Sequence, residues 1–414
     1  MDGTEVDVLC LVRSAGHLRT WYVTLQVVRI GVDAVPFAFE QTGVARYLGS
    51  ILDEMLAVDT SIEYLLYTPI PVSIPLRHGN WRVRCAPDRF SLRPSIWAQT
   101  TLPGLLASDK VGAFWGQPTN LPITLKHRCF RVLTIHDLVP WVRPESMRFR
   151  SWLRMRIMLG PVARAAEAIV ADSEATAALA QHNLRVSRER MRVVYAAASP
   201  SFRPVPHEKA RTTLVREFGL SREFMIFVST IEPRKDHLTL LRALESVPNA
   251  PLLVLAGGDG WRCGRILARI RESEKVGRVR YLGRVTDELL PVLYTAASLS
   301  VYPSLYEGFG LPILEAMACG CPVVCSDSSS LPEVGGSAAC YFRAGDDRDL
   351  ARKLTELVHD DGRLKAMSAA GLVQARRFSF RAAASEILEI IRRGVPAHSI
   401  IHEGRSARHH PTAG

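Results

Sequence analysis

The chain has 414 residues, of which 47% are hydrophobic, and it carries a net charge of +11 at pH 7. This length and composition predict a globular protein of two or more domains, and the lack of any apolar run of about 18 residues argues against a membrane-spanning helix. The charge favours an anionic partner such as nucleic acid, an anionic membrane or a phosphorylated substrate.

The N-terminus carries acidic residues where a secretion signal would be basic. Asp2, Glu5 and Asp7 lie among the first residues, and Arg13 and Arg19 interrupt the apolar stretches that follow. This pattern argues against a cleaved signal peptide and predicts a cytoplasmic protein. Because residues 1–27 have no evident place in a sheet, we expect them to form an N-terminal extension.

From residue 28 to about residue 205, short apolar strands alternate with amphipathic helices. The stretches RIGVDA, EYLLYT, RVLTIHD, IVADS and RVVY are typical of buried parallel strands. Gly43 precedes the helical pattern GVARYLGSILDEML, which is a weak signal for a glycine loop. His136 ends one of the strands, where a histidine can be either structural or functional.

The alternation restarts after residue 205 and continues to about residue 375. The strand FMIFVST is followed directly by IEPRKDH, which places Arg234 and Lys235 at the carboxyl end of a strand. Two cations there could neutralise a diphosphate, although a solvated basic pair would give the same pattern. The two halves predict an α/β protein whose Rossmann-like parallel-sheet domains, 28–205 and 206–375, face each other across a cleft. We expect residues 394–414 to form a disordered tail.

The stretch PSLYEGFGLPILEAMACGCPVVCS, residues 303–326, places Glu307 on a loop and Glu315 on a short helix behind it. Gly308 and Gly310 allow close backbone approach, so the helix N-terminus could bind a phosphate through free N–H groups. Carboxylates beside such a site would suit the diols at the two ends of a nucleotide sugar. A helix-terminal carboxylate and a solvated loop glutamate remain the alternative.

The eight cysteines show no C-x-x-C pair, and the cluster of Cys319, Cys321 and Cys325 has no nearby histidine that would complete a zinc site. We therefore expect these cysteines to pack in the core. The sequence predicts neither a metal nor a resident cofactor.

The order of IEPRK, AGGDGW, RYLGRVTDELLPVLY and YPSLYEGFGLPILEAMACGCPVVCS resembles the retaining GT-B glycosyltransferases of the E-x7-E family, glycosyltransferase family 4, which includes mannosyltransferases. The resemblance runs from about residue 28 to residue 391. It implies a GT-B fold in which residues 376–393 form a helix that returns to the first domain. One departure is the loop AFWGQPTN, which lacks the histidine often found there in relatives.

The resemblance also implies roles for single residues. Arg234 and Lys235 would bind the diphosphate of a nucleotide-sugar donor, Glu315 the ribose hydroxyls, and Glu307 the transferred sugar. His136 would lie beside the anomeric carbon. The remaining implied positions are backbone groups of the donor site and one glycine on the acceptor side: Gly308, Phe309, Gly310, Leu311 and Gly43.

The activity implied is transfer of a hexose with retention, with mannose from GDP-mannose as the first guess and UDP-sugars second. The acceptor would be a growing, lipid-linked cell-surface polysaccharide. Two alternatives are a sugar-nucleotide epimerase on the same fold and a non-enzymatic nucleic-acid-binding protein. The second rests on charge alone, because no nucleic-acid-binding motif is present, and we expect no nucleic-acid partner.

The segment RPESMRFRSWLRMRIMLGPVAR, residues 143–164, interleaves arginines with Phe149, Trp152, Leu153, Met155 and Ile157. This pairing of cations with apolar and aromatic side chains is typical of helices that bind anionic bilayers. An ordinary half-buried helix would also show mixed residues. We expect peripheral association with the inner face of the membrane.

Overall fold

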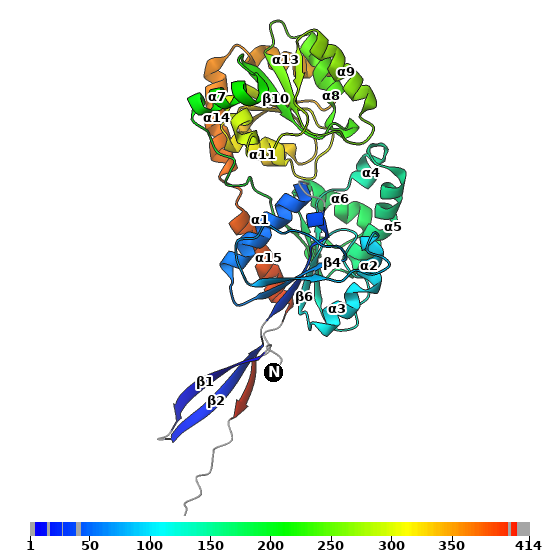
Figure 1. Cartoon of the computed structure of the whole chain (residues 1–414), viewed down its shortest axis with the longest axis vertical. Coiled ribbons are helices and arrows are strands. Elements are labelled where there is room, and N and C mark those ends of the chain that lie inside the picture. The colour runs from blue at the N-terminus through cyan, green and yellow to red at the C-terminus, as the bar shows by residue number, and fades with distance from the viewer. Residues whose placement is uncertain (1–4, 15–16, 27, 39–42, 396–398, 404–414) are drawn as a thin grey trace, which may run out of the picture.

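The computed structural model describes residues 5–14, 17–26, 28–38, 43–395 and 399–403. Two parallel sheets of seven and six strands form two stacked α/β domains (Figure 1). The predicted fold class is confirmed: both sheets are flanked by helices, and the central strands are buried, as expected when helices cover both faces of a parallel sheet.

The first domain contains the seven-stranded sheet, with strand order β5-β4-β3-β6-β7-β8-β9. Its strands are β3 (Arg29–Asp33), β4 (Glu63–Thr68), β5 (Trp81–Cys85), β6 (Ala113–Gly116), β7 (Phe130–Ile135), β8 (Ala168–Ala171) and β9 (Met191–Val193). Its helices are α1 (Gly43–Val58), α2 (Pro94–Thr100), α3 (Leu102–Ser108), α4 (Val139–Val142), α5 (Phe149–Ala165) and α6 (Glu174–Leu184), with 3₁₀ turns η1 (Val35–Ala38), η2 (Pro144–Ser146) and η3 (Arg188–Arg190).

The second domain contains the six-stranded sheet, with strand order β12-β11-β10-β13-β14-β15. Its strands are β10 (Phe224–Val228), β11 (Leu252–Ala256), β12 (Val279–Tyr281), β13 (Leu299–Tyr302), β14 (Val323–Ser326) and β15 (Ala339–Phe342). Its helices are α7 (His207–Phe218), α8 (His237–Glu245), α9 (Gly264–Lys275), α10 (Leu290–Ala296), α11 (Leu311–Ala318), α12 (Leu331–Gly335), α13 (Asp347–Leu357) and α14 (Asp361–Ala375), with 3₁₀ turns η4 (Pro233–Lys235) and η5 (Gly336–Ala338).

The last helix, α15 (Phe380–Gly394), lies in the first domain although it follows α14 in sequence (Figure 1). It packs along α1 and against β7. Its buried face is formed by Phe380, Ala383, Ala384, Ile387, Leu388 and Ile391. The chain therefore crosses between the domains twice, first between β9 and α7 and again between α14 and α15.

A third, antiparallel sheet consists of β1 (Glu5–Ser14), β2 (His17–Gln26) and β16 (Ser399–Glu403), in the order β1-β2-β16. It projects from the first domain in Figure 1. β16 belongs to the segment 394–414 that was expected to be a disordered tail, and it pairs antiparallel with β2. Residues 404–414 of that tail lie outside the described residues.

Candidate functional site

A cavity of about 450 Å³ lies between the two domains, at the carboxyl ends of their strands. Ligands in open parallel sheets bind at this edge. All ten residues singled out in the sequence line this one cavity: Gly43, His136, Arg234, Lys235, Glu307, Gly308, Phe309, Gly310, Leu311 and Glu315. The structure thus brings together residues from both halves of the chain.

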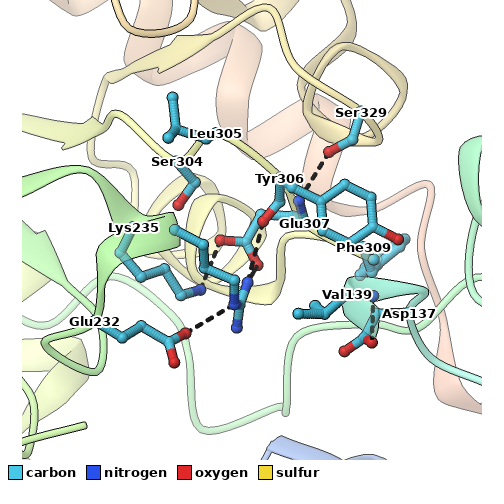
Figure 2. A network of polar contacts seen from close by, with 12 residues as sticks. Asp137, Val139, Glu232, Lys235, Ser304, Leu305, Tyr306, Glu307, Phe309 and Ser329 are labelled. Atoms are coloured by element: carbon cyan, nitrogen blue, oxygen red, sulfur yellow. Dashed lines mark hydrogen bonds and ion pairs between the residues drawn. The ribbon is translucent and has the colours of Figure 1, made fainter. Parts of the chain in front are cut away.

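Glu307 contacts both cations of η4, and Figure 2 shows it beside Lys235. Its Oε1 is 2.6 Å from Nζ of Lys235, and its Oε2 is 2.9 Å from Nη1 of Arg234. Arg234 also pairs with Glu232, whose Oε1 lies 2.8 Å from Nε of Arg234. The two cations are therefore already balanced by two carboxylates. A bound diphosphate would draw on their remaining N–H donors rather than on uncompensated charge.

Burial and pairing act in opposite directions on Glu307. Burial alone would raise the pKa of its carboxyl, but Lys235 and Arg234 outweigh it and lower the pKa to about 2. Burial, reinforced by the neighbouring Arg234, lowers the pKa of Lys235. Ser329 fixes the loop, because its Oγ accepts a 2.8 Å hydrogen bond from the Glu307 amide (Figure 2). Glu307 is thus a rigid, ionised side chain.

Glu315 has the opposite electrostatic character. It lies on α11 and is only 4% exposed, and burial raises its pKa to about 7. The nearest cation is Arg46 of α1, in the opposite domain, whose Nη1 lies 3.4 Å from Oε1 of Glu315. The same Nη1 donates a 3.2 Å hydrogen bond to Asp287.

His136 is held through both ring nitrogens. Its Nδ1 lies 2.7 Å from Oδ2 of Asp172, and its Nε2 lies 2.8 Å from Oε1 of Gln117. The Tyr47 ring meets it edge-on at 4.9 Å between centroids. Burial alone would lower the pKa of His136, but Asp172 raises it above its ordinary value. Both ring nitrogens are therefore engaged by polar partners, and the Asp172 carboxylate favours the protonated form of the ring.

The loop between Glu307 and α11 is fixed to the first domain by its backbone. The Gly308 carbonyl accepts hydrogen bonds from Oγ of Ser173 at 2.6 Å and Oγ1 of Thr176 at 3.1 Å. Gly310 has a φ of +110°, which favours glycine, and lies directly before the first turn of α11. Sequence reasoning predicted this turn but not its anchor in the opposite domain.

Several polar residues of the site were missed: Arg46, Gln117, Asp172, Ser173 and Glu232. Two of them had a usable signal, because Asp172 and Ser173 follow the strand IVA as His136 follows its strand. Gln117 belongs to the loop AFWGQPTN, which contains no histidine. Among the described residues, no group of three or more His, Cys, Asp or Glu side chains could hold a metal ion.

The segment predicted to bind membranes forms η2 and α5, and the structure separates its apolar residues into two sets. Phe149, Leu153 and Ile157 are 69%, 39% and 59% exposed, at the spacing of one helix face. Trp152 instead turns inward and donates a 3.1 Å hydrogen bond to the Pro140 carbonyl. No helix in the described part of the chain has both the length and the hydropathy to span a bilayer.

Residues 214–373 match the model of the family "Glycosyl transferases group 1". O-antigen chain mannosyltransferase B of Escherichia coli is 34% identical over 261 residues, which cover 62% of this chain and 68% of that protein. The chain belongs to the group 1 glycosyltransferases. The serotype-specific mannosyltransferase WbdA of Escherichia coli is 30% identical to this glycosyltransferase over 60% of the chain, but that match covers only 32% of WbdA.

Solved structures confirm the GT-B fold of this glycosyltransferase. Sucrose-phosphate synthase from Thermosynechococcus elongatus superimposes with a TM-score of 0.73 at 19% identity, covering 88% of this chain and 98% of that one. Anabaena HepE in complex with UDP-glucose gives a TM-score of 0.67 at 18% identity, over 87% of this chain and 98% of that one. At these identities the likeness concerns the fold alone.

Proposed function

We propose that this glycosyltransferase moves a hexose, with mannose from GDP-mannose as the first candidate, to a lipid-linked cell-surface polysaccharide with retention of anomeric configuration. The observation that carries the proposal is that one cavity is lined by Glu307 with its two cations, by Glu315 and by His136. Similarity to O-antigen mannosyltransferases supports the choice of sugar and acceptor.

In this proposal the donor lies along the cleft with its diphosphate at η4. Arg234 and Lys235 stabilise the charge that develops on the diphosphate as the anomeric C–O bond breaks, together with the N-terminus of α11. Glu315 accepts hydrogen bonds from the ribose and Glu307 from the transferred sugar. These groups are contributed by the chain itself, and the proposal needs no metal or resident cofactor.

Two contacts favour retention by front-face transfer. Glu307, the carboxylate at the sugar end, is held by cations at 2.6 and 2.9 Å, so it is poorly placed as a covalent nucleophile. His136 has both ring nitrogens engaged and cannot take the acceptor proton as a base. The acceptor oxygen would therefore bond to the anomeric carbon on the face that the diphosphate leaves, and its proton would pass to the leaving phosphate oxygen.

A thermal-shift panel of GDP, UDP and ADP tests the donor, because a nucleotide that binds the native state raises the melting temperature. We expect the largest shift with GDP. NMR of the product formed from GDP-mannose should then show the α-anomer of the donor preserved. An inverted product would overturn retention, and turnover of a nucleotide sugar without acceptor would indicate the epimerase instead.

The exposed stripe of α5, Phe149, Leu153 and Ile157, supports contact with an anionic bilayer. Arg150 and Arg154 flank this stripe and are exposed. An amphipathic helix of this kind inserts its apolar side chains while its arginines bind lipid phosphates. Since α5 belongs to the same domain as His136, membrane contact there would bring a lipid-linked acceptor to the cleft from the cytoplasmic side.

Liposome flotation with anionic and neutral lipids tests this contact. We expect binding to anionic vesicles that weakens with salt and is lost in Arg150→Glu/Arg154→Glu. Arg156 is left unchanged because its guanidinium stacks on Trp141 at 4.7 Å. The charge-matched control Arg265→Glu/Arg271→Glu, on α9, should bind like the wild type. Equal partitioning of all three proteins would refute the proposal.

A further inference from the structure

Arg46 lies on the first turns of α1 and reaches across the cleft to the second domain. Its Nη1 contacts two carboxylates there, Glu315 at 3.4 Å and Asp287 at 3.2 Å. Its Nε is buried and has no hydrogen-bond partner in the described part of the chain. Arg46 also lines both large cavities beside α1, so it forms part of the wall between them.

Glu315 depends on this arginine because its other neighbours supply no positive charge. Asp287 is a second carboxylate, and Tyr294 and Cys319 are neutral because burial raises their pKa values, that of Cys319 to about 12. Among the ion pairs of the described residues, Glu315 takes part in one only, that with Arg46. Even with Arg46 beside it, this 4% exposed carboxyl has a pKa of about 7, so without the arginine it would hold its proton well above neutral pH.

We propose that Arg46 is a positioning residue for the donor, which favours the ionised form of Glu315 so that its two oxygens can accept both ribose hydroxyls. This inference rests on the proposed function, in which Glu315 binds the ribose. A protonated carboxyl would present a donor to one hydroxyl and lose the strength of charge-assisted bonds to both.

The arrangement also links the two domains. Arg46 belongs to the first domain and Glu315 to the second, so the charge on Glu315 is stabilised only when the domains are as close as they are here. Donor affinity should therefore depend on a residue that makes no contact with the diphosphate cations of η4. Arg46 is not expected to act as a hinge residue, because its effect on donor affinity passes through the carboxyl group of Glu315.

The test is calorimetric measurement of GDP affinity between pH 6 and pH 9 for the wild type and Arg46→Met, which keeps the length but not the charge. Wild-type affinity should fall below about pH 7. In Arg46→Met the fall in affinity should begin at higher pH. At low pH the Kd of the variant should exceed that of the wild type by about tenfold for each unit by which the pKa of Glu315 rises. The two proteins should converge at pH 9. A loss of affinity that is equal at every pH would overturn the inference.

Two further comparisons separate this role from a structural one. In a Glu315→Gln background, Arg46→Met should cause no additional loss, whereas independent roles would give additive losses. The loss should also shrink with 2′,3′-dideoxy-GDP, which lacks the hydroxyls that Glu315 binds. Arg46→Lys should restore part of the affinity. The proposal would be contradicted if the losses from Arg46→Met and Glu315→Gln were additive and if Arg46→Met weakened GDP and 2′,3′-dideoxy-GDP equally.

The control variant is Arg242→Met, which removes an arginine that contacts Asp347 at 3.4 Å within the second domain, outside the lining of the cleft. Its GDP affinity should match the wild type at every pH. If the wild type binds none of GDP, UDP and ADP, the proposed function and this inference both fail. If it binds a nucleotide and Arg46→Met binds equally well throughout, only the inference fails.

Discussion

The space that a side chain on Gly308 would fill is occupied by the backbone of His136. A Cβ atom built at Gly308 would lie 1.8 Å from the His136 carbonyl oxygen, which belongs to the opposite domain. Real Cβ atoms do not approach backbone oxygen so closely. Glycine at this position therefore allows the loop that carries Glu307 to touch the first domain.

Gly308→Ala should lower transfer roughly a hundredfold, because the loop must move by about an ångström from its productive position. Each domain should keep its fold, since the clash lies between the two domains. Steady-state kinetics and the thermal unfolding midpoint measure the two effects. Gly264→Ala, where a Cβ atom would meet nothing within 4 Å, is the matched control. Normal turnover by Gly308→Ala would show that this contact is dispensable.

Glu307→Gln should destabilise the ligand-free protein by about 3 kcal/mol, because it leaves the buried Lys235 and Arg234 short of one carboxylate. Urea unfolding at pH 7 measures this change. The control Glu356→Gln removes a carboxylate that pairs with Arg352 and Arg363, all three side chains being exposed, and it should cost under about 0.5 kcal/mol. Similar free energies of unfolding for the two variants would contradict the view that Glu307 balances the cations.

Glu315→Gln should stabilise the ligand-free protein at pH 8 while abolishing most donor binding. The folded-state pKa of about 7 lies above the ordinary value of 4.5, so the folded protein holds a proton between these pH values that the unfolded chain releases. The free energy of unfolding therefore falls as pH rises through this window. The variant avoids that fall and should be about 1 to 3 kcal/mol more stable at pH 8. Urea unfolding should show the gain at pH 8 and little difference at pH 4; a gain that is equal at both values would be inconsistent with ionisation as the cause.

Asp172→Asn should lower the pKa of His136, because burial then acts without the carboxylate that opposes it. In the wild type the raised pKa contributes stability that is present below pH 6.5 and is lost as pH rises through the folded-state pKa. The variant should thus be about 1 to 3 kcal/mol less stable at pH 6, with a smaller difference at pH 9. NMR titration of the His136 ring measures the pKa directly, and an unchanged value would rule out Asp172 as the cause of the shift.

Much of this site could be predicted because its parts are local in the sequence. Gly308, Gly310 and the apolar run that ends at Cys325 specify a loop, a helix and a buried strand within one short stretch. The carboxyl ends of parallel strands then place Arg234 and Glu307 at one edge. The contact that acts on the charge of Glu315 was not predictable in this way, because Arg46 meets Glu315 only through the relative position of two domains.

In the fold, too, locally encoded elements were predictable and elements set by tertiary contacts were not. Strands with continuous apolar runs, such as β4 and β10, were recognised from the sequence. The edge strand β5 was missed because four of its five residues are exposed and its sequence, WRVRC, lacks an apolar run. β16 was missed because its pairing with β2 joins opposite ends of the chain. Pairings set by tertiary contact leave little trace in local patterns.

The position of α15 has a consequence for how the protein is made. The apolar face of this helix covers α1, which is synthesised more than three hundred residues earlier. A ribosome therefore completes every strand of the first domain, and the whole second domain, before it releases the helix that closes the first. Until α15 is made, α1 lacks its packing partner, so the first domain is the last to be completed. A stop codon shortly before Phe380 would leave the face of α1 that contacts α15 uncovered.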